Sequence, residues 1–493
     1  MSSHQTDMTA GTGWNFDNSY SQLPDDFYTR QGPVAVSAPG LTICNHDLAA
    51  QLGLNLTGLS DEDAAQLFSG NVMPTGADPL AQAYAGHQFG HLSMLGDGRA
   101  VLLGEQVTPR GERFDIQLKG SGRTPYSRGG DGRAAFGPML REYIISEAMH
   151  ALGIPTTRGL AVVTTGDPVF RETTLPGAIL ARVATSHIRV GTFQYIASRQ
   201  NLAELKQLAD YTIARHFPEA ADTDQPYLSL LYAVMEKQAS LVSAWMQVGF
   251  IHGVMNTDNM AISGETIDYG PCAFMDAYDP QTVFSSIDQQ GRYAYENQPQ
   301  LAHWNLARFA ETLLPLLDTD AKKAMDLANE AIQSFGGLYQ RHWLAAMRKK
   351  LGLLTEEAED GALGSDLLQW MRQNNADYTN SFRALADETL LAQPAYQDPV
   401  FQAWHAKWQG RLARNQKPLT AAQSLMRTNN PAIIPRNHQV EAALAAANDN
   451  ADLTVMHRLL AALENPYTDS EEYAEYKNPP PPSDRPYQTF CGT

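Results

Sequence analysis

The sequence is poor in cysteine, in positive charge and in long apolar segments. Three cysteines among 493 residues cannot build a disulfide scaffold, which favours a reducing compartment, and we expect the cytoplasm. The 36 Lys and Arg against 54 Asp and Glu give a net charge of −18, which argues against a dedicated nucleic-acid binder. No segment has the roughly 18 consecutive apolar residues of a membrane span, and the polar N-terminus lacks the parts of a signal peptide. We therefore expect a protein that binds neither nucleic acid nor membranes, and we also expect a monomer.

The composition is otherwise that of a globular protein. Hydrophobic residues make up 43% and charged residues 18%, which is enough apolar mass for a large core. A prior of about 150 residues per domain gives two to four folding units, or one large enzyme domain.

The chain changes character along its length, and four regions follow from this. Residues 1–70 are predicted to be an N-terminal extension, and residues 71–195 a glycine-rich lobe with nucleotide-binding loops. Residues 196–440 are predicted to be a helical lobe with catalytic and metal loops, and residues 441–493 a helix and a Pro-rich tail. The simplest packing is an α+β protein with a small β-containing lobe, a large helical lobe and a cleft between them.

Hydrophobic periodicity predicts the individual elements. Helical spacing begins with a short helix at 45–53, recurs at 138–152 and becomes frequent after residue 195, for example at 365–379. Strands are expected at 100–106, 114–119, 161–165, 169–172 and 178–183, with a turn at 166–167.

The first candidate site residues are a lysine and a glutamate. Lys119 ends a predicted strand in which apolar and polar residues alternate, and Glu142 lies on the following helix. In kinase-like folds such a carboxylate fixes the ammonium group, which in turn neutralises phosphate oxygens. Either residue alone is more often a solvated surface charge, so the pair gains weight only if a metal-binding loop follows.

Such a loop follows. Residues 251–260 read IHGVMNTDNM, and IDYG at 267–270 follows a predicted short hairpin. The side chains of Asn259 and Asp268 supply hard oxygen ligands of the kind that Mg²⁺ prefers beside phosphates. Asp258 is then a candidate base beside an attacking hydroxyl. Asp-Tyr-Gly alone is most often a β-turn, and it is the combination that indicates a catalytic loop.

Glycines combined with arginines provide the third signal. The tetrapeptide Gly-Asp-Gly-Arg occurs at 96–99 and again at 130–133, on both sides of the strand that ends at Lys119. Glycine amides can approach a phosphate closely, and arginine can bind it bidentately. Arg182 and Arg189 add two cations on either side of Ser186-His187. The alternative interpretation is a pair of Asp-Gly turns with ordinary surface arginines.

These segments resemble the selenoprotein O family, which are protein adenylyltransferases with a protein-kinase-like fold. The similarity covers about residues 20–493 and is carried by long motifs. The motifs are AGHQFG at 85–90, GDGR at 96–99, LKGSGRTPYSRGGDGRA at 118–134, REYIISEAMHALGIPTTR at 141–158, HGVMNTDNM at 252–260, DYGP at 268–271 and QGRYAYENQP at 290–299.

The resemblance implies a specific reaction. ATP is expected in the reverse orientation from protein kinases, so that its α-phosphate faces a Ser, Thr or Tyr hydroxyl of a protein. AMP is then transferred, pyrophosphate leaves, and Mg²⁺ or Mn²⁺ is the cofactor. On this pattern Asp258 accepts the proton, Glu142 pairs with Lys119, and Asn259 and Asp268 hold the metal. The implied nucleotide contacts are Gly96, Gly98, Arg99, Lys119, Asp131, Gly132, Arg182, Arg189 and Asp268.

The sequence departs from ordinary kinases at one position and leaves alternatives open. The Asp expected two residues after His252 is Val254, so a kinase base is missing there, and Asp258 replaces it in an adenylyltransferase. An ordinary phosphotransferase and a non-catalytic nucleotide-binding scaffold stay as alternatives. Cys491, near the C-terminus, resembles the cysteine form of the family's selenocysteine and is a candidate redox partner of Cys44 or Cys272.

Overall fold

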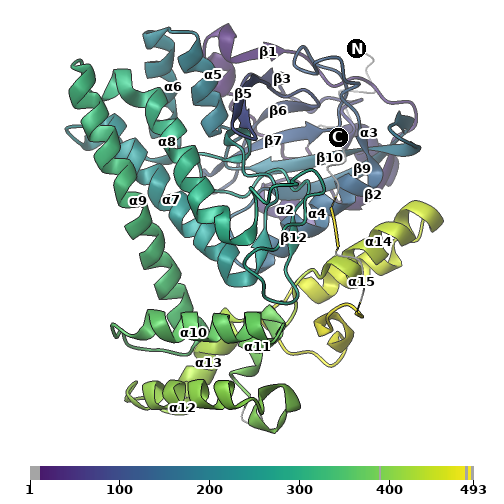
Figure 1. Cartoon of the computed structure of the whole chain (residues 1–493). Coiled ribbons are helices and arrows are strands. Elements are labelled where there is room, and N and C mark those ends of the chain that lie inside the picture. The colour runs from purple at the N-terminus through teal and green to yellow at the C-terminus, as the bar shows by residue number, and fades with distance from the viewer. Residues whose placement is uncertain (1–10, 388–389, 483–486, 490–493) are drawn as a thin grey trace.

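An eight-stranded antiparallel sheet organises the N-terminal half of the molecule (Figure 1). The structure is a computed structural model that describes residues 11–387, 390–482 and 487–489. The short β8 (Ala134–Ala135) pairs with β10 beside the main path of the sheet. Along that path the order is β1 (Tyr28–Arg30), β3 (Leu80–Gln82), β6 (Ala100–Val107), β7 (Arg113–Lys119), β10 (Thr174–Ala184), β9 (Arg158–Phe170) and β2 (Gly40–Cys44).

Alternation along β7 separates the two faces of the sheet. Ile116 and Leu118 belong to a core that is completed by α2 (His46–Gln51) and α3 (Asp61–Phe68). Because successive strand residues point to opposite faces, Gln117 and Lys119 lie on the other face. The expected strands at 100–106 and 114–119 are confirmed to within one residue.

The helix α4 (Phe136–Ala151) packs on the face of the sheet that carries Lys119. Its buried residues Leu140 and Ile144 share a core with Leu180 of β10, and Glu142 is buried on the same helix. The expected helix at 138–152 is thus confirmed, with a start two residues earlier. The helix ends before Gly153, which adopts a φ of 76° that favours glycine.

Helices dominate the remaining described chain (Figure 1), in which α7, α8 and α9 pack against one another and α14 and α15 pack against α4. No helix among the described residues has the length and apolar character needed to cross a membrane. The helices are α5 (Val190–Ser198), α6 (Leu202–His216), α7 (Pro226–Val248), α8 (Gln298–Leu317), α9 (Ala321–Lys350), α10 (Asp360–Gln373), α11 (Tyr378–Ala384), α12 (Pro399–Ala413), α13 (Leu419–Asn429), α14 (Asn437–Asn450) and α15 (Thr454–Leu463).

Two short two-stranded sheets lie outside the main one. The strands β4 (Ala85–Gln88) and β5 (His91–Met94) form a hairpin, and β11 (Phe250–Ile251) pairs with β12 (Ala273–Phe274). The second pair closes the base of the loop that carries the HGVMNTDNM and DYGP motifs.

The expected turn at 166–167 is wrong, because β9 continues through it to Phe170. Pro168 pairs with Pro176 and Thr164 with Ala178, so residues 165–167 oppose Gly177 alone. Gly166, with a φ of 74°, therefore forms a bulge and not a turn.

The expected hairpin at 260–267 is also wrong. Ala261 bridges to Arg189, and Thr266 bridges to Thr156, so the segment finds its partners in other parts of the chain. The expected helix at 365–379 is two helices, α10 and α11, because Asn375 adopts a φ of 50° between them. Cys44 and Cys272 are free thiols, and Cys491 lies outside the described residues, so its redox pairing stays a prediction.

Candidate active site

A cavity of about 350 Å³ lies between the sheet, the glycine-rich loops and the segment 254–271. Glu142 is not among its lining residues and lies buried next to Lys119. The cavity brings together the other predicted site residues, namely Gly96, Gly98, Arg99, Lys119, Asp131, Gly132, Arg182, Arg189, Asp258, Asn259 and Asp268.

Lys119 occupies the end of β7 and contacts two carboxylates. Its Nζ donates to Glu142 Oε2 at 2.6 Å and to Asp268 Oδ1 at 2.8 Å. The Lys119 and Glu142 side chains are 6% and 3% exposed, so little water screens the pair. The sheet and α4 thus fix the position of the ammonium group at the cavity wall.

Asp268 is the point at which three cationic side chains meet. Its Oδ1 accepts from Lys119 and, at 2.6 Å, from Arg182 Nη1, and its Oδ2 accepts from Arg189 Nη1 at 3.2 Å. Its φ of 62° lies in the left-handed region, which is uncommon for a residue other than glycine. Burial tends to raise the pKa of this carboxyl, but Arg182, Lys119 and Arg189 hold the pKa well below its ordinary value. Asp268 is therefore ionised.

Arg182 and Arg189 are buried, with 3% and 1% of their surface exposed. Burial works against the charge of Arg182, but Asp268 and Glu142 raise its pKa above the ordinary value. The Arg189 guanidinium lies over the Tyr84 ring, 4.3 Å from its centroid, and Nη1 donates to the Asp258 carbonyl at 2.8 Å. Its Nη2 is buried and has no hydrogen-bond partner among the residues that the structure describes. An unpartnered cationic donor at a cavity wall is suited to an anionic ligand.

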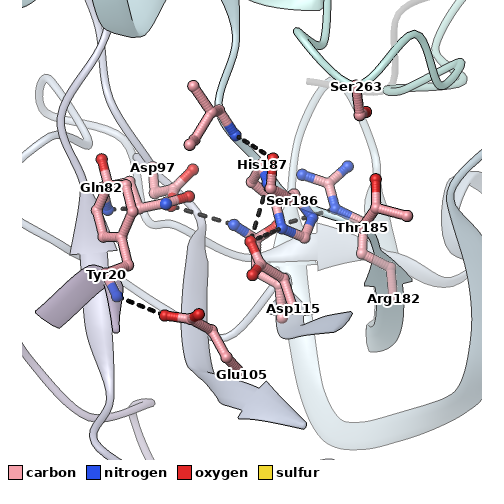
Figure 2. Close-up of polar contacts among 12 residues, drawn as sticks. Tyr20, Gln82, Asp97, Glu105, Asp115, Arg182, Thr185, Ser186, His187 and Ser263 are labelled. Atoms are coloured by element: carbon pink, nitrogen blue, oxygen red, sulfur yellow. Dashed lines mark hydrogen bonds and ion pairs between the residues drawn. The ribbon is translucent and has the colours of Figure 1, made fainter. Parts of the chain in front are cut away.

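Sequence reasoning missed the residues that hold Arg182. Arg182 Nε donates to Gln117 Oε1 at 2.9 Å, and Gln117 Nε2 donates to Asp97 Oδ2 at 3.1 Å. Asp97 also accepts the Gln82 amide at 3.0 Å, and burial raises its pKa to about 6. Figure 2 shows Asp97 and Arg182 within one layer of polar side chains. The signal was present, because alternation along β7 places Gln117 on the same face as Lys119.

A second buried network fixes the segment between Arg182 and Arg189 (Figure 2). His187 N and Nδ1 donate to Asp115 Oδ2 at 2.8 and 3.0 Å. Arg215 of α6 donates to Asp115 Oδ1 and to the Thr185 carbonyl, each at 2.6 Å. Burial lowers the pKa of His187 to about 4, so the ring is a neutral donor. This network ties the Ser186-His187 segment to the sheet and to the helices.

Asp258 and Asn259 lie on a single 3₁₀ turn, Thr257–Asn259. Asn259 Nδ2 donates to the Val254 carbonyl at 2.9 Å. This bond uses the side-chain N–H group of Asn259 and not its side-chain oxygen. Asp258 Oδ1 is buried and accepts no hydrogen bond from the described part of the chain, and burial raises the Asp258 pKa to about 6. A Cβ on Gly86 of β4 would lie 2.1 Å from this oxygen, so glycine lets the hairpin approach Asp258.

The residues present fit a divalent cation bound together with phosphates. Asn259 and Asp268 both line the cavity and offer hard oxygen donors that suit Mg²⁺ or Mn²⁺. No group of three or more His, Cys, Asp or Glu that could hold a metal occurs within the described part of the chain. Phosphate oxygens and water would thus supply the other ligands, as is usual for Mg²⁺ at nucleotides.

The glycine-rich loops approach each other closely beside the cavity. A Cβ on Gly132 would lie 2.2 Å from the Gly122 carbonyl oxygen, and Gly132 has a φ of 67°. Asp131 pairs with Arg171 from the β9–β10 turn at 2.8 Å. Arg99 lines the cavity without a carboxylate partner within the described chain. The Arg99 side chain therefore remains available to an anionic ligand at this wall.

Comparisons with known proteins agree on one family. A family model described as "Protein adenylyltransferase SelO" matches residues 12–464. The chain is similar to a protein nucleotidyltransferase YdiU of Nitrosococcus oceani, with 63% identity over 481 residues that cover 98% of each chain. It is also similar to the protein nucleotidyltransferase YdiU of Syntrophotalea carbinolica, with 62% identity over 485 residues that cover 98% of this chain and 99% of the relative.

Proposed function

The chain belongs to the protein adenylyltransferase SelO family, and we propose that it transfers AMP from ATP to Ser, Thr or Tyr hydroxyls of proteins. The observation that carries this proposal is the buried cluster of Lys119, Arg182 and Arg189 around Asp268. Seven Lys and Arg side chains line the cavity against four Asp side chains, so a cationic excess lines the cavity and favours an anionic ligand.

We propose that the cationic cluster receives the β- and γ-phosphates of an inverted ATP. As the bond between the α-phosphorus and its bridging oxygen breaks, negative charge builds up on the pyrophosphate, and arginines held in place stabilise it without rearranging. Arg189 Nη2, which has no hydrogen-bond partner among the described residues, supports this role. A protein kinase instead needs its γ-phosphate free at the acceptor side.

Asp258 is the proposed proton acceptor. The acceptor oxygen attacks the α-phosphorus, the new oxygen–phosphorus bond forms, pyrophosphate leaves, and the hydroxyl proton passes to the Asp258 carboxylate. Two observations support this role: Asp258 lines the cavity, and its buried Oδ1 has no partner within the described chain. Val254 occupies the position of the kinase base, which argues against an ordinary phosphotransferase.

The activity implies ATP as substrate and a divalent metal. We propose that Asn259 and Asp268 hold Mg²⁺ or Mn²⁺, which would neutralise phosphate charge when bound. Gly96, Gly98, Arg99, Asp131 and Gly132 are the proposed further contacts of the nucleotide.

Several finer features are also proposals. The mixed arrangement of helices and an antiparallel sheet is compatible with a kinase-like bilobal fold, with lobes at 71–195 and 196–440 and extensions at 1–70 and 441–493. A cytoplasmic location, a monomeric state and the absence of nucleic-acid partners stay predictions from the composition.

ATP labelled separately at the α- and γ-phosphate tests the proposal. We expect label on protein from the α-phosphate alone, with release of pyrophosphate. Label from the γ-phosphate would indicate a kinase, and no transfer from either position would indicate a nucleotide-binding scaffold. Either result would overturn the proposed function.

A further inference from the structure

A second cavity, of about 740 Å³, lies beside the candidate active site. The turn of the β4–β5 hairpin forms one wall, and residues 287–304 form the other. Phe89 and Ile287 line it with 41% and 54% of their surface exposed, and Trp304 lines it as well. Exposed apolar side chains gathered in one depression are typical of a surface that binds another molecule.

This second cavity, called the groove below, is connected to Asp258 by two sets of contacts. The hairpin is anchored beside Asp258, because the His87 amide donates to Thr257 Oγ1 at 2.7 Å, and Gln88 lines the nucleotide cavity immediately before Phe89. On the opposite wall, Tyr293 O–H donates to Asn256, which also lines the nucleotide cavity, and the Tyr293 ring contacts Phe89.

The groove also holds a cation without an acidic partner. The Arg292 guanidinium lies 5.8 Å from the Tyr293 ring centroid and 5.3 Å from that of Trp304. Within the described chain no carboxylate comes within ion-pair distance of it, and its Nε is buried without a hydrogen-bond partner. The nearby Asp288 is occupied by the backbone amides of Arg292 and Tyr293. Arg292 therefore offers its charge to a ligand.

We propose that this groove binds the acceptor polypeptide, and that it selects acceptors with an apolar and an acidic side chain near the reacting hydroxyl. The proposal rests on the proposed function, because it assumes that a protein hydroxyl must reach Asp258. The apolar side chain would lie against Phe89 and Ile287, and the acidic side chain would pair with Arg292. Aromatic residues and arginine are also the side chains that contribute most at protein interfaces.

The test compares two pools of synthetic peptides, each with one Ser, Thr or Tyr and flanking Leu, that differ only in carrying Glu or Lys. With ATP labelled at the α-phosphate, the wild-type protein should label the Glu pool about 5- to 30-fold more efficiently, as expected for an interfacial arginine. Arg292→Glu should reverse this preference, and Ile287→Ser should raise KM for the peptides of both pools. Neither variant should change the affinity for ATP.

Arg110→Glu is the matched control. Arg110 lies in the turn before β7, at the end of that strand opposite to Lys119, and should keep the wild-type preference. Equal labelling of the two pools, or no peptide labelling by a wild-type protein that still labels another protein, would overturn the docking proposal alone. No transfer from the α-phosphate to any protein would instead overturn the proposed function.

Discussion

Two buried clusters in this molecule place arginines around one carboxylate, and they differ in what they leave unpaired. At Asp360, Arg411 Nε donates to Oδ1 at 2.7 Å and Arg348 Nε donates to Oδ2 at 2.8 Å. The Glu357 amide and the Thr355 carbonyl complete that cluster. At Asp268, by contrast, the cationic groups line a cavity, and Arg189 Nη2 has no hydrogen-bond partner in the described ranges of the chain.

The difference separates a structural cluster from a binding site. Buried polar groups in folded proteins are nearly always hydrogen-bonded, so one that is left unpaired beside a cavity indicates a ligand. The side chains around Asp360 hold α9, α10 and α12 together. Those around Asp268 hold one another and still present donors to the cavity. Removing the Asp268 carboxylate should therefore abolish activity in a folded protein. Removing the Asp360 carboxylate should lower stability and leave activity nearly unchanged.

The largest expected effect is loss of AMP transfer in Asp268→Asn. The substitution keeps the shape of the side chain but removes a charge that orients three cations and that we propose binds the metal. Transfer of the α-phosphate label should fall by at least about 1000-fold, as for other groups that act together in catalysis. Circular dichroism should show a folded protein. Full activity of the folded variant would contradict the metal and charge assignments.

Asp360→Asn should reverse that pattern. It removes the buried carboxylate that Arg411 and Arg348 share, while each arginine keeps a second partner, Glu357 and Glu356 respectively. Loss of hydrogen bonds to a charged group typically costs about 1.5–3 kcal/mol of folding free energy. Denaturant unfolding should show this loss, whereas kcat of the protein that remains folded should stay near the wild-type value. A large loss of kcat with normal stability would mean that the Asp360 cluster also serves catalysis and is not only structural.

Arg182→Gln and Arg189→Gln should each lower the transfer rate by roughly 10–1000-fold, the range for losing a donor to transition-state charge. The measurement is single-turnover transfer from ATP labelled at the α-phosphate. Arg414→Gln is a suitable control, because Arg414 pairs with Glu357 at a surface site where 52% of its side chain is exposed. Near-normal transfer in both active-site variants would require the pyrophosphate end to lie elsewhere.

Much of the site could be predicted because its chemistry lies in local motifs. Lys119, Asp258 and Asp268 each sit in a run of residues with an unusual composition, and alternation along β7 gave the strand. Alternation along β7 places Gln117 on the face of Lys119, but its contact with Arg182 depends on pairing between β7 and β10, which no local pattern specifies. Gln117 and its partner Asp97 were therefore missed as positioning residues. The bulge at Gly166 was missed for the same reason, since glycine permits a turn and a bulge equally.

Lys350 sharpens the comparison, because it is a buried cation that pairs with no carboxylate among the described residues. Its Nζ donates to the Gln247 carbonyl at 2.8 Å and lies 4.1 Å from the Phe382 ring centroid, and burial lowers its pKa to about 7. The unfolded chain binds this proton more tightly, so stability should rise with pH from about 7 to about 10. Lys350→Met should remove that rise and stabilise the fold by ~1–3 kcal/mol at neutral pH. Urea unfolding at several pH values measures both effects, and a less stable Lys350→Met protein would contradict the prediction.

The smallest expected effect concerns Gln117, which positions Arg182 without touching the cavity. Gln117→Leu removes the acceptor of Arg182 Nε and leaves Asp97 with one donor fewer, so transfer should fall by about 3- to 10-fold, the value of roughly one hydrogen bond.

Gln117→Glu distinguishes positioning from packing. In this variant the carboxyl group at position 117 can donate to Asp97 only while the two carboxyl groups share a proton. AMP transfer by Gln117→Glu, relative to wild type, should therefore fall as pH rises from about 6 to about 8. A merely structural role would lower the stability of both variants but would leave their pH profiles parallel to that of the wild type. Parallel profiles would therefore show that Asp97 and Gln117 do not set the position of Arg182.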